Sequence, residues 1–519
     1  MVANVERPAR RGGRARHKIE ALAEISLRSH SYRQLRHPFQ PQRVFSDDGI
    51  ANIHNMALRV LRELGIKILH DEARTIFEMA GALVDHDSQM VRIGDELVAE
   101  ALRIAPRSIR MRAAAQHREQ LIEPGAMIFY PGSGCPNVSD LERGRRPGSL
   151  ESYNETIKLH QSFDVIHMFG PSAEPQDVAA EFRHYEMMRG QLVNGDKPMF
   201  VYARGKQQVE ESFDLIRLAL DLSDEDFVDG VWALTVINTN SPRQLDVPMA
   251  QGVIDFARAR QLSIITPFCL AGAMAPVSIA GALVLQHAEA LAAITLAQLA
   301  QPGAPVLYGG FASNVDMKSG SPAFGTPEHI KFSIVSGQLA RHIDLPWRGA
   351  AGAASNTADM QAATENNMGL WAALQANTTV SVHSAGWLEG GLCFGYEKFI
   401  NDVEALQTLA ELCMTTPEDE DSLGWSALQD VQPGGHFFAT EHTMARYKDA
   451  FYEPLVADLS NFGAWSEAGA KTSTDRATDI WRQILQEFKA PDHAEEAGER
   501  IAGYIVDHMA KGGAAPAGG

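Results

Sequence analysis

Residue types able to hold a cationic ligand stand where several short apolar stretches in the middle of the chain end. Five aromatic residues are of this kind: Trp232, Tyr308, Phe311, Trp371 and Trp387. Two or three aromatic rings around one cavity would form a box for a quaternary ammonium ion, held by cation–π contacts. Aromatic residues at such positions more often belong to a hydrophobic core, so the sequence leaves both interpretations open.

Familiar catalytic signatures are missing from the chain, which contains no HExxH, GxSxG, Walker A or GxGxxG sequence. Lys197 and Lys318 would form a Schiff base only if desolvated. However, Lys197 precedes an expected strand, on the face away from barrel active sites, and Lys318 lies in a polar turn. His436 and His442 are metal ligands by residue type, but no cysteine or third ligand stands near them. We therefore expect no metal site.

Glycine is frequent in the loops that follow the apolar stretches. Gly272, Gly309, Gly310 and Gly352 are four examples. Small residues at the rim of a site let a large, flat ligand approach the backbone closely. Glycine is also common in loops because turns need positive φ angles, so this pattern alone does not decide between the two roles.

The apolar stretches themselves predict the fold. They are β-branched or aromatic, end in a loop and precede a helical pattern, at a spacing typical of βα units. Eight such units close into a TIM (β/α)8 barrel, in which function lies at the carboxyl ends of the strands. The expected strands cover residues 126–130, 164–169, 198–202, 231–237, 262–267, 305–308, 345–347 and 378–383. The sequence thus predicts an α/β protein of the TIM-barrel class.

The remaining segments divide the chain around this barrel, which we expect to span residues 121–402. Residues 1–43 are predicted to be a basic, partly disordered arm, and residues 44–120 a helical cap with a small hairpin. A helical C-terminal extension is expected at residues 403–510. The Gly-, Ala- and Pro-rich residues 511–519 are predicted to be a disordered tail.

Composition narrows the class of protein. The net charge of −19 argues against a nucleic-acid partner, which would need a concentrated basic surface. The four cysteines lie far apart in the sequence, as is typical of reduced thiols in a cytoplasmic protein. The most apolar stretch, residues 270–299, is interrupted by Pro276, Gln286 and Glu289. It therefore predicts a loop and a buried helix rather than a membrane span.

Ordered blocks of sequence run from the cap to the C-terminal extension and carry a family resemblance. They include Ala80-Gly-Ala-Leu-Val-Asp85, Asp140-Leu-Glu-Arg-Gly-Arg-Arg-Pro147, Leu270-Ala-Gly-Ala-Met-Ala-Pro276, Asp316-Met-Lys-Ser-Gly320 and Gly434-Gly-His-Phe-Phe438. In these blocks, between about residues 50 and 491, the chain resembles the trimethylamine methyltransferase family of corrinoid-dependent TIM-barrel enzymes. The resemblance supports the barrel expected from the strand pattern.

This resemblance implies a methyltransferase that moves a methyl group from a methylamine to the cob(I)alamin of a separate corrinoid protein. The chain itself would hold no cofactor tightly. Founding members of the family carry pyrrolysine, whereas this sequence has only standard residues. It is therefore similar to the branch without pyrrolysine, some of whose members demethylate glycine betaine or related quaternary amines. We expect a small quaternary or tertiary methylamine as substrate, and a homo-oligomeric protein.

Within this hypothesis the aromatic box is formed by Tyr308, Phe311 and Trp387, and Asn238 is a further substrate contact. Gly272, Gly309, Gly310 and Gly352 would form a rim that faces the corrin. The candidate catalytic residues are His383, which would orient the substrate by a hydrogen bond, and Glu365 or Asp316, which would supply negative charge. Arg348 and Arg243 are candidate donors for the carboxylate of a betaine.

Two other functions stay open at this stage. One is a catalytically silent barrel that serves as a binding or regulatory subunit, because in this family the reactive group resides on the partner. The other is a lyase on the same fold, which would need a Schiff-base lysine or a metal.

Overall fold

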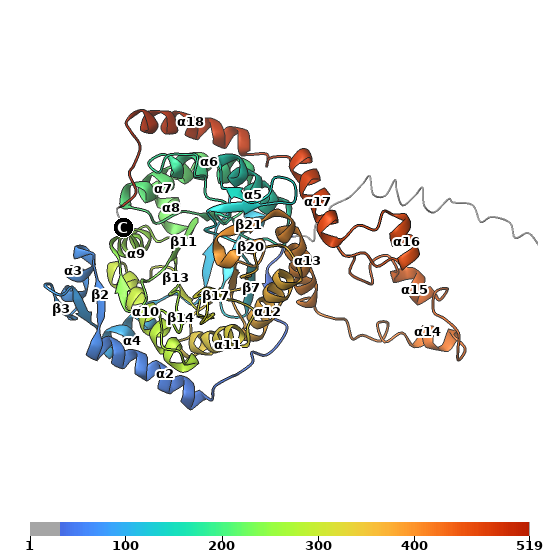
Figure 1. The fold of residues 1–519 in the computed structure, drawn as a ribbon, viewed down its shortest axis with the longest axis horizontal. Coiled ribbons are helices and arrows are strands. Elements are labelled where there is room, and N and C mark those ends of the chain that lie inside the picture. The colour runs from blue at the N-terminus through green and yellow to red at the C-terminus, as the bar shows by residue number, and fades with distance from the viewer. Residues whose placement is uncertain (1–31, 518–519) are drawn as a thin grey trace, which may run out of the picture.

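A curved, seven-stranded parallel sheet forms the centre of the computed structural model, which describes residues 32–517 (Figure 1). Its strand order is β7-β19-β18-β15-β13-β11-β10, and β1 (Leu35–Arg36) pairs antiparallel with β7. The parallel strands are β7 (Ala126–Phe129), β10 (Met199–Phe200), β11 (Ala233–Ile237), β13 (Leu262–Ile265), β15 (Val306–Gly309), β18 (Trp347–Ala350) and β19 (Val380–Val382). Seven of the eight expected strands are present. Residues 1–31 of the expected basic arm lie outside the described part of the chain.

The strand expected at residues 164–169 is wrong, because the backbone there is irregular. The segment nevertheless runs between the two ends of the sheet. The His167 N–H donates to the Phe129 carbonyl of β7, and the Phe169 N–H donates to the Pro198 carbonyl beside β10, each at 3.0 Å. The Phe129 N–H donates to His167 Nδ1 at 2.9 Å. A side chain therefore takes the place that a backbone carbonyl would have in a regular ladder.

Side chains alternate between the two faces of the sheet, as the period of a β-strand requires. One set, which includes Ile128, Leu234, Ile264 and Leu307, packs together on the concave side. The alternate set, which includes Tyr308, packs outward against the surrounding helices. Because of this alternation, a shift of one residue decides whether a side chain faces the site or the outer core.

Helices cover the outer face of the sheet (Figure 1). They are α5 (Leu150–Ser162), α6 (Arg183–Asn194), α7 (Lys206–Leu220), α8 (Asp224–Asp229), α9 (Val247–Arg258), α10 (Ile279–Ala300), α11 (Pro327–His342), α12 (Met360–Ala376) and α13 (Tyr396–Leu412). Side-chain caps such as Ser278 and Thr326 start them by accepting backbone N–H bonds. In the described part of the chain, α10 alone is long and apolar enough to cross a membrane, but most of it is buried as in a core helix.

The cap precedes the sheet and packs on the outer helices. Its elements are α2 (Asp47–Arg59), the π-helix η1 (Val60–Leu64), β2 (Ile66–Ile68), α3 (Asp71–Met79), the hairpin β3 (Leu83–Asp85) and β4 (Met90–Arg92), and α4 (Asp95–Ile104). The hairpin β5 (Ile109–Met111) and β6 (Gln120–Ile122), with the short helix η2 (Gln116–Arg118) between its strands, leads into β7. β2 also pairs with β12 (Gln244–Leu245), which joins the cap to a loop that follows β11.

Short strands organise the loops after the main strands. One small sheet contains β8 (Asn137–Ser139), β9 (Arg146–Pro147), β20 (Trp387–Leu388) and β21 (Cys393–Gly395), with the short helix η3 (Glu389–Gly391) between β20 and β21. Another contains β14 (Leu270–Ala271), β16 (Ser313–Val315) and β17 (Pro322–Ala323). These pairings hold loops from different βα units against one another.

The C-terminal extension has two parts. The short helices α14 (Trp425–Asp430), α15 (Glu441–Arg446) and α16 (Phe462–Glu467) project away from the body (Figure 1). The longer helices return to it: α17 (Ser473–Glu487) packs on α5 and α13, and α18 (Ala494–Ala510) packs on α6 and α7.

The expected disordered tail is wrong for residues 511–517, which are held on the body. The Ala514 N–H donates to the Glu181 carbonyl at 3.1 Å, and the Ala517 N–H donates to the Arg204 carbonyl at 2.8 Å. Gln208 on α7 donates to the Ala514 carbonyl at 2.8 Å. Composition favours disorder here, but specific backbone hydrogen bonds and the burial of Ala514 override it.

Candidate functional site

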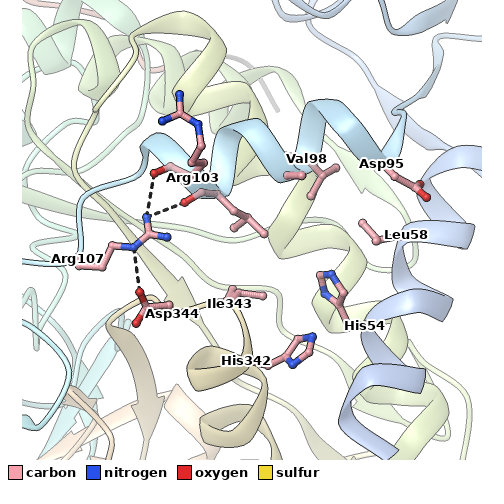
Figure 2. A pocket seen from close by; sticks show the side chains of 11 residues that line it. His54, Leu58, Asp95, Val98, Arg103, Arg107, His342, Ile343 and Asp344 are labelled. Atoms are coloured by element: carbon pink, nitrogen blue, oxygen red, sulfur yellow. Dashed lines mark hydrogen bonds and ion pairs between the residues drawn. The ribbon is translucent and has the colours of Figure 1, made fainter. Parts of the chain in front are cut away.

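A cavity of about 420 Å³ lies between the cap and the outer helices (Figure 2). It is lined by residues of α2, α4 and the end of α11, and no strand of the parallel sheet contributes to it. Its charged groups already have partners: Arg107 pairs with Asp344 at 3.3 Å and Arg103 pairs with Glu100. The first of these pairs joins the cap to the loop after α11, whereas the second lies within α4.

A buried arginine stands at the carboxyl end of the sheet. Arg348 is the second residue of β18 and only 1% exposed. Its Nε and Nη1 atoms have no hydrogen-bond partner in the described residues, and none of the described carboxylates forms an ion pair with it. Burial lowers the pKa of Arg348 to about 9. A buried cation without an anion is costly, and such a group is typical of a binding site that a ligand completes.

An aromatic ring lies over this guanidinium and belongs to a larger cluster of rings. The Cζ atom of Arg348 lies 4.4 Å from the centre of the Phe311 ring. Phe311 in turn contacts Phe268 and Phe324, with ring centres 4.7 and 5.9 Å apart, and Trp387 at 6.0 Å. These rings contact one another. They line neither the cavity of about 420 Å³ nor a second cavity of about 400 Å³. Two of the three predicted box residues, Phe311 and Trp387, are thus brought together.

His383 joins the same cluster at the end of β19. Its ring stacks on Trp387 with centres 4.3 Å apart, and its backbone has a positive φ of 59°. Burial, reinforced by the nearby Arg348 charge, holds the pKa of His383 well below its ordinary value. The Nδ1 atom has no partner in the part of the chain that the structure describes. A neutral imidazole in this position can orient a ligand by one hydrogen bond.

This state of His383 predicts how activity depends on pH. Because the imidazole stays neutral through the neutral range, we expect the rate to remain flat between about pH 6 and pH 8, around the ordinary histidine pKa. Single-turnover rates of the wild type and of His383→Ala, measured across this range, check the expectation. A bell-shaped profile that disappears in His383→Ala would contradict it.

Of the four glycines predicted to form a rim, three pack against neighbouring groups of the chain and one is exposed. A side chain on Gly352, whose φ is +101°, would meet the Trp387 ring at 2.3 Å. A side chain on Gly310 would meet Ser336 of α11, and one on Gly309 would meet the Ile265 carbonyl of the neighbouring strand. These three glycines are buried, and each leaves space for a neighbouring group of the same chain. Gly272 is exposed in its loop.

Tyr308, the third predicted box residue, does not face the site, so this prediction is wrong. It lies in β15 with its side chain outward, and its hydroxyl is 3.0 Å from His287 Nδ1 on α10. Its neighbour Leu307 is the one that faces the concave side. The alternation of a strand assigns the two residues to opposite faces.

The two predicted carboxylates are also absent from the cluster. Asp316 is fully exposed and closes its own turn, accepting hydrogen bonds from the Ser319 N–H and hydroxyl at 2.9 and 2.7 Å. Glu365 of α12 accepts the N–H groups of Ala354 and Ser355 at 2.7 and 3.0 Å. Glu365 therefore holds the loop after β18. The hypothesis that either residue supplies charge to the ligand is not supported by these positions.

Arg243 and Asn238 follow β11 but lie outside the buried cluster. Arg243 donates from its backbone to Glu289 at 2.7 Å and from its side chain to the Gly65 carbonyl of the cap at 3.2 Å. It joins the cap to the loop, and these contacts do not place it beside Arg348 and the rings. Asn238 is exposed at the end of β11.

Sequence reasoning missed three members of the cluster. Tyr130 follows β7 directly, is fully buried, and its hydroxyl has no hydrogen-bond partner among the described residues. Phe268 lies three residues after the end of β13 and is half-buried. Their positions just past a strand end were the signal that could have found them. Phe324 carries no such signal, because it comes to the site only through the β16–β17 pairing.

Lysine and metal chemistry find no support in the described residues. Lys197 is buried and donates to the carbonyls of His160 and Phe163 at 2.6 and 2.8 Å, near the amino end of β10. Lys318 is exposed. In the described chain, no group of three or more His, Cys, Asp and Glu side chains is placed to hold a metal ion.

These features define the chain as an α/β protein with a buried arginine and an aromatic cluster, a candidate ligand site, at the carboxyl ends of its parallel strands. Its sequence matches the trimethylamine methyltransferase (MTTB) family over residues 9–513. The chain belongs to this family, whose members are methyltransferases.

Two relatives and one solved structure show what the chain is similar to. The chain is 33% identical over 465 residues to the glycine betaine methyltransferase of Desulfitobacterium hafniense strain Y51, covering 89% of this chain and 96% of that protein. It is 26% identical over 464 residues to a trimethylamine methyltransferase of D. hafniense strain DSM 10664 / DCB-2, covering 89% and 92%. The solved monomethylamine methyltransferase of Methanosarcina barkeri gives a TM-score of 0.42 at 9% identity, covering 90% and 95%. That last similarity is too weak to define the fold.

Proposed function

We propose that this protein transfers a methyl group from a quaternary amine that also bears a carboxylate, of the glycine betaine type, to the cob(I)alamin of a separate corrinoid protein. We also propose that the sheet closes into a complete eight-membered barrel, in which the irregular segment 164–169 takes the position of the second strand. The proposed reaction is carried by one observation, the buried and unpartnered guanidinium of Arg348 among aromatic rings.

The two ends of a betaine match the two kinds of group in the site. A carboxylate would satisfy the free Nε and Nη1 donors of Arg348, and charge-assisted bonds of this kind are among the stronger ones in proteins. The trimethylammonium would lie against the rings of Phe311 and Trp387, which attract cations through their faces. Trimethylamine lacks the carboxylate and would leave Arg348 unpaired, so it is the weaker candidate.

The chemistry explains why the site has no acid–base pair. When the methyl group leaves a quaternary nitrogen, the electrons of the broken N–C bond stay on nitrogen, which becomes a neutral tertiary amine. No proton has to move. The corrinoid protein supplies a cobalt(I) nucleophile that accepts the methyl group. The task of Arg348, His383 and the rings is therefore to align the substrate and exclude water, which is a large part of catalysis for such a displacement.

The loops on the same side of the sheet carry exposed apolar residues that suit a protein partner. They are Val277, Met317, Met360 and Leu392, and each follows a different main strand. Exposed apolar side chains grouped around a site are typical of a protein interface. Together with the exposed Gly272 loop, they are the surface on which we propose that the corrinoid protein docks.

The direct test mixes the purified protein, glycine betaine and a reduced corrinoid protein, and follows the conversion of the Co(I) absorption to that of methyl-Co(III). We expect methyl transfer only when all three are present, and dimethylglycine in equal amount. Trimethylamine and choline, which lack the carboxylate, should react far more slowly. Demethylation without the corrinoid protein would overturn the mechanism. Absence of transfer from every amine would favour the silent-barrel alternative.

We also propose that the protein acts in the cytoplasm and as a homo-oligomer, without a nucleic-acid or membrane partner. The separated cysteines and the negative net charge support the first part of this proposal. The surface described next supports the second.

A further inference from the structure

The part of the extension that projects from the body has almost no core of its own. We call residues 414–470, which include α14, α15 and α16, the projection (Figure 1). Only three of its residues, Ala427, Thr440 and Val456, are buried. A segment of this length that buries so little has to gain its order from other contacts.

The projection instead exposes large apolar side chains. Phe438 is 80% and Phe451 is 87% exposed. The full set on the projection is Met414, Leu423, Trp425, Leu428, Phe437, Phe438, Met444, Tyr447, Phe451, Leu459 and Phe462. Elsewhere in the described chain, Phe39 and Trp371 are the exposed aromatic residues of this kind. Concentrated apolar exposure on one segment marks a protein interface rather than ordinary surface.

Charge limits what can bind there. The projection contains ten acidic residues and only two basic ones, Arg446 and Lys448. An acidic surface repels acidic lipids and acidic proteins, so its partner must offer positive charge beside an apolar face. The chain as a whole is acidic, but residues 1–31 contain seven basic and three acidic residues.

This basic segment joins the described structure at the root of the projection. Arg33, next to the first described residue, forms an ion pair with Glu411 of α13 at 2.7 Å and donates to the Ala410 carbonyl at 3.3 Å. The projection begins three residues after Glu411. A chain of 31 residues reaches up to about 100 Å when extended, which is long enough to contact a neighbouring molecule.

We propose that the projection is a self-association surface, which binds a second copy of this chain with the partner's basic residues 1–31 as the complementary element. Each copy then offers both halves of the contact, the self-complementarity that a symmetric dimer needs. The proposal does not rest on the proposed reaction, because the projection lies outside the strand-end site.

The test is sedimentation velocity of the full-length protein over a range of micromolar concentrations. We expect the wild type to associate and Phe438→Ser/Phe451→Ser to weaken self-association by about tenfold or more, as for central aromatic residues of interfaces. The matched control is Met79→Ser/Leu83→Ser, which removes two exposed apolar side chains from the cap. Circular dichroism should show the same fold in all three proteins.

A charge reversal tests the complementary element. Arg10→Glu/Arg11→Glu/Arg14→Glu should dissociate the assembly, and Glu418→Lys/Glu420→Lys added to the same chain should restore it. A monomeric wild type, or an unchanged assembly in the phenylalanine variant, would overturn the proposal. The proposal would also be overturned if the protein were a monomer and removal of residues 1–31 increased the binding of a dye to apolar surface. That result would mean that the segment covers the projection of its own chain. Loss of methyl transfer with intact assembly would concern the proposed reaction alone.

Discussion

Arg348→Met is expected to reduce the use of glycine betaine strongly while leaving the protein folded and at least as stable. Removing one partner of a buried, hydrogen-bonded charge pair costs about 2–5 kcal/mol, which lowers kcat/KM about 30-fold to several thousand-fold. The free protein loses nothing comparable, because Arg348 has no ion-pair partner among the described residues. Replacing an uncompensated buried charge by an apolar side chain of similar length is often stabilising.

The measurement is kcat/KM for methyl transfer, together with the thermal midpoint of unfolding. Arg243→Met is the control, because that side chain bonds the cap and not the cluster. We expect Arg243→Met to retain the affinity for substrate. Equal losses in the two variants, or a strongly destabilised Arg348→Met, would contradict the assignment of the carboxylate site.

The same guanidinium gives a second readout in alkaline solution. Because burial lowers the pKa of Arg348 to about 9, the free protein loses this charge as the pH rises through that value, and betaine binding should weaken. The effect on stability has the opposite sign. In the unfolded chain the arginine keeps its proton to higher pH, so above the folded-state pKa the unfolded state binds more protons than the folded state. The free energy of unfolding therefore rises with pH in this range. Titration calorimetry of betaine binding across this range checks the first part, and Arg348→Met should show no such step.

Phe311→Leu is expected to have the second-largest effect, on the cationic end of the substrate. The substitution keeps an apolar side chain of similar size but removes the aromatic ring that contacts both Arg348 and Trp387. Cation–π contacts in desolvated sites contribute about 2 kcal/mol, so the Kd for glycine betaine should rise up to about 30-fold. Calorimetric titration measures the Kd directly.

Tyr308→Phe is the matched control for this prediction. It removes only a hydroxyl that faces His287 on the outer side of the sheet. The variant should therefore bind glycine betaine as the wild type does. A large loss in Tyr308→Phe, or unchanged affinity in Phe311→Leu, would show that the cationic group lies elsewhere.

Much of the fold could be predicted because it depends on local sequence. Seven of the eight expected strands are present, since runs of β-branched and aromatic residues bounded by turn residues favour extended backbone wherever they pack. The second expected strand could not be excluded locally, because what replaces its ladder is a tertiary contact, the bond from the Phe129 N–H to His167 Nδ1. The order within residues 511–517 was also invisible, because it depends on carbonyl groups of Glu181 and Arg204, some 300 residues away.

The candidate site divides in the same way. The sequence alone determined which loops to inspect, and it identified Arg348, Phe311, Trp387 and His383 as residue types able to hold a charged methylamine. The tertiary structure decided which of the predicted residues face one another. Tyr308 turned outward because the faces of a strand alternate with every residue, a distinction finer than the error in a predicted strand boundary.

Tertiary and loop contacts give other roles to Glu365, Asp316 and the rim glycines, for a related reason. Backbone N–H groups in loops must be satisfied, and the two carboxylates accept such groups from their own loops. Gly352 is required by the volume of the Trp387 ring. Some of these demands are local, as for Asp316 and Ser319, and others come from residues farther along the chain, as for Gly352 and Trp387. Residue type therefore indicates only what a side chain is able to do, whereas packing determines what it does.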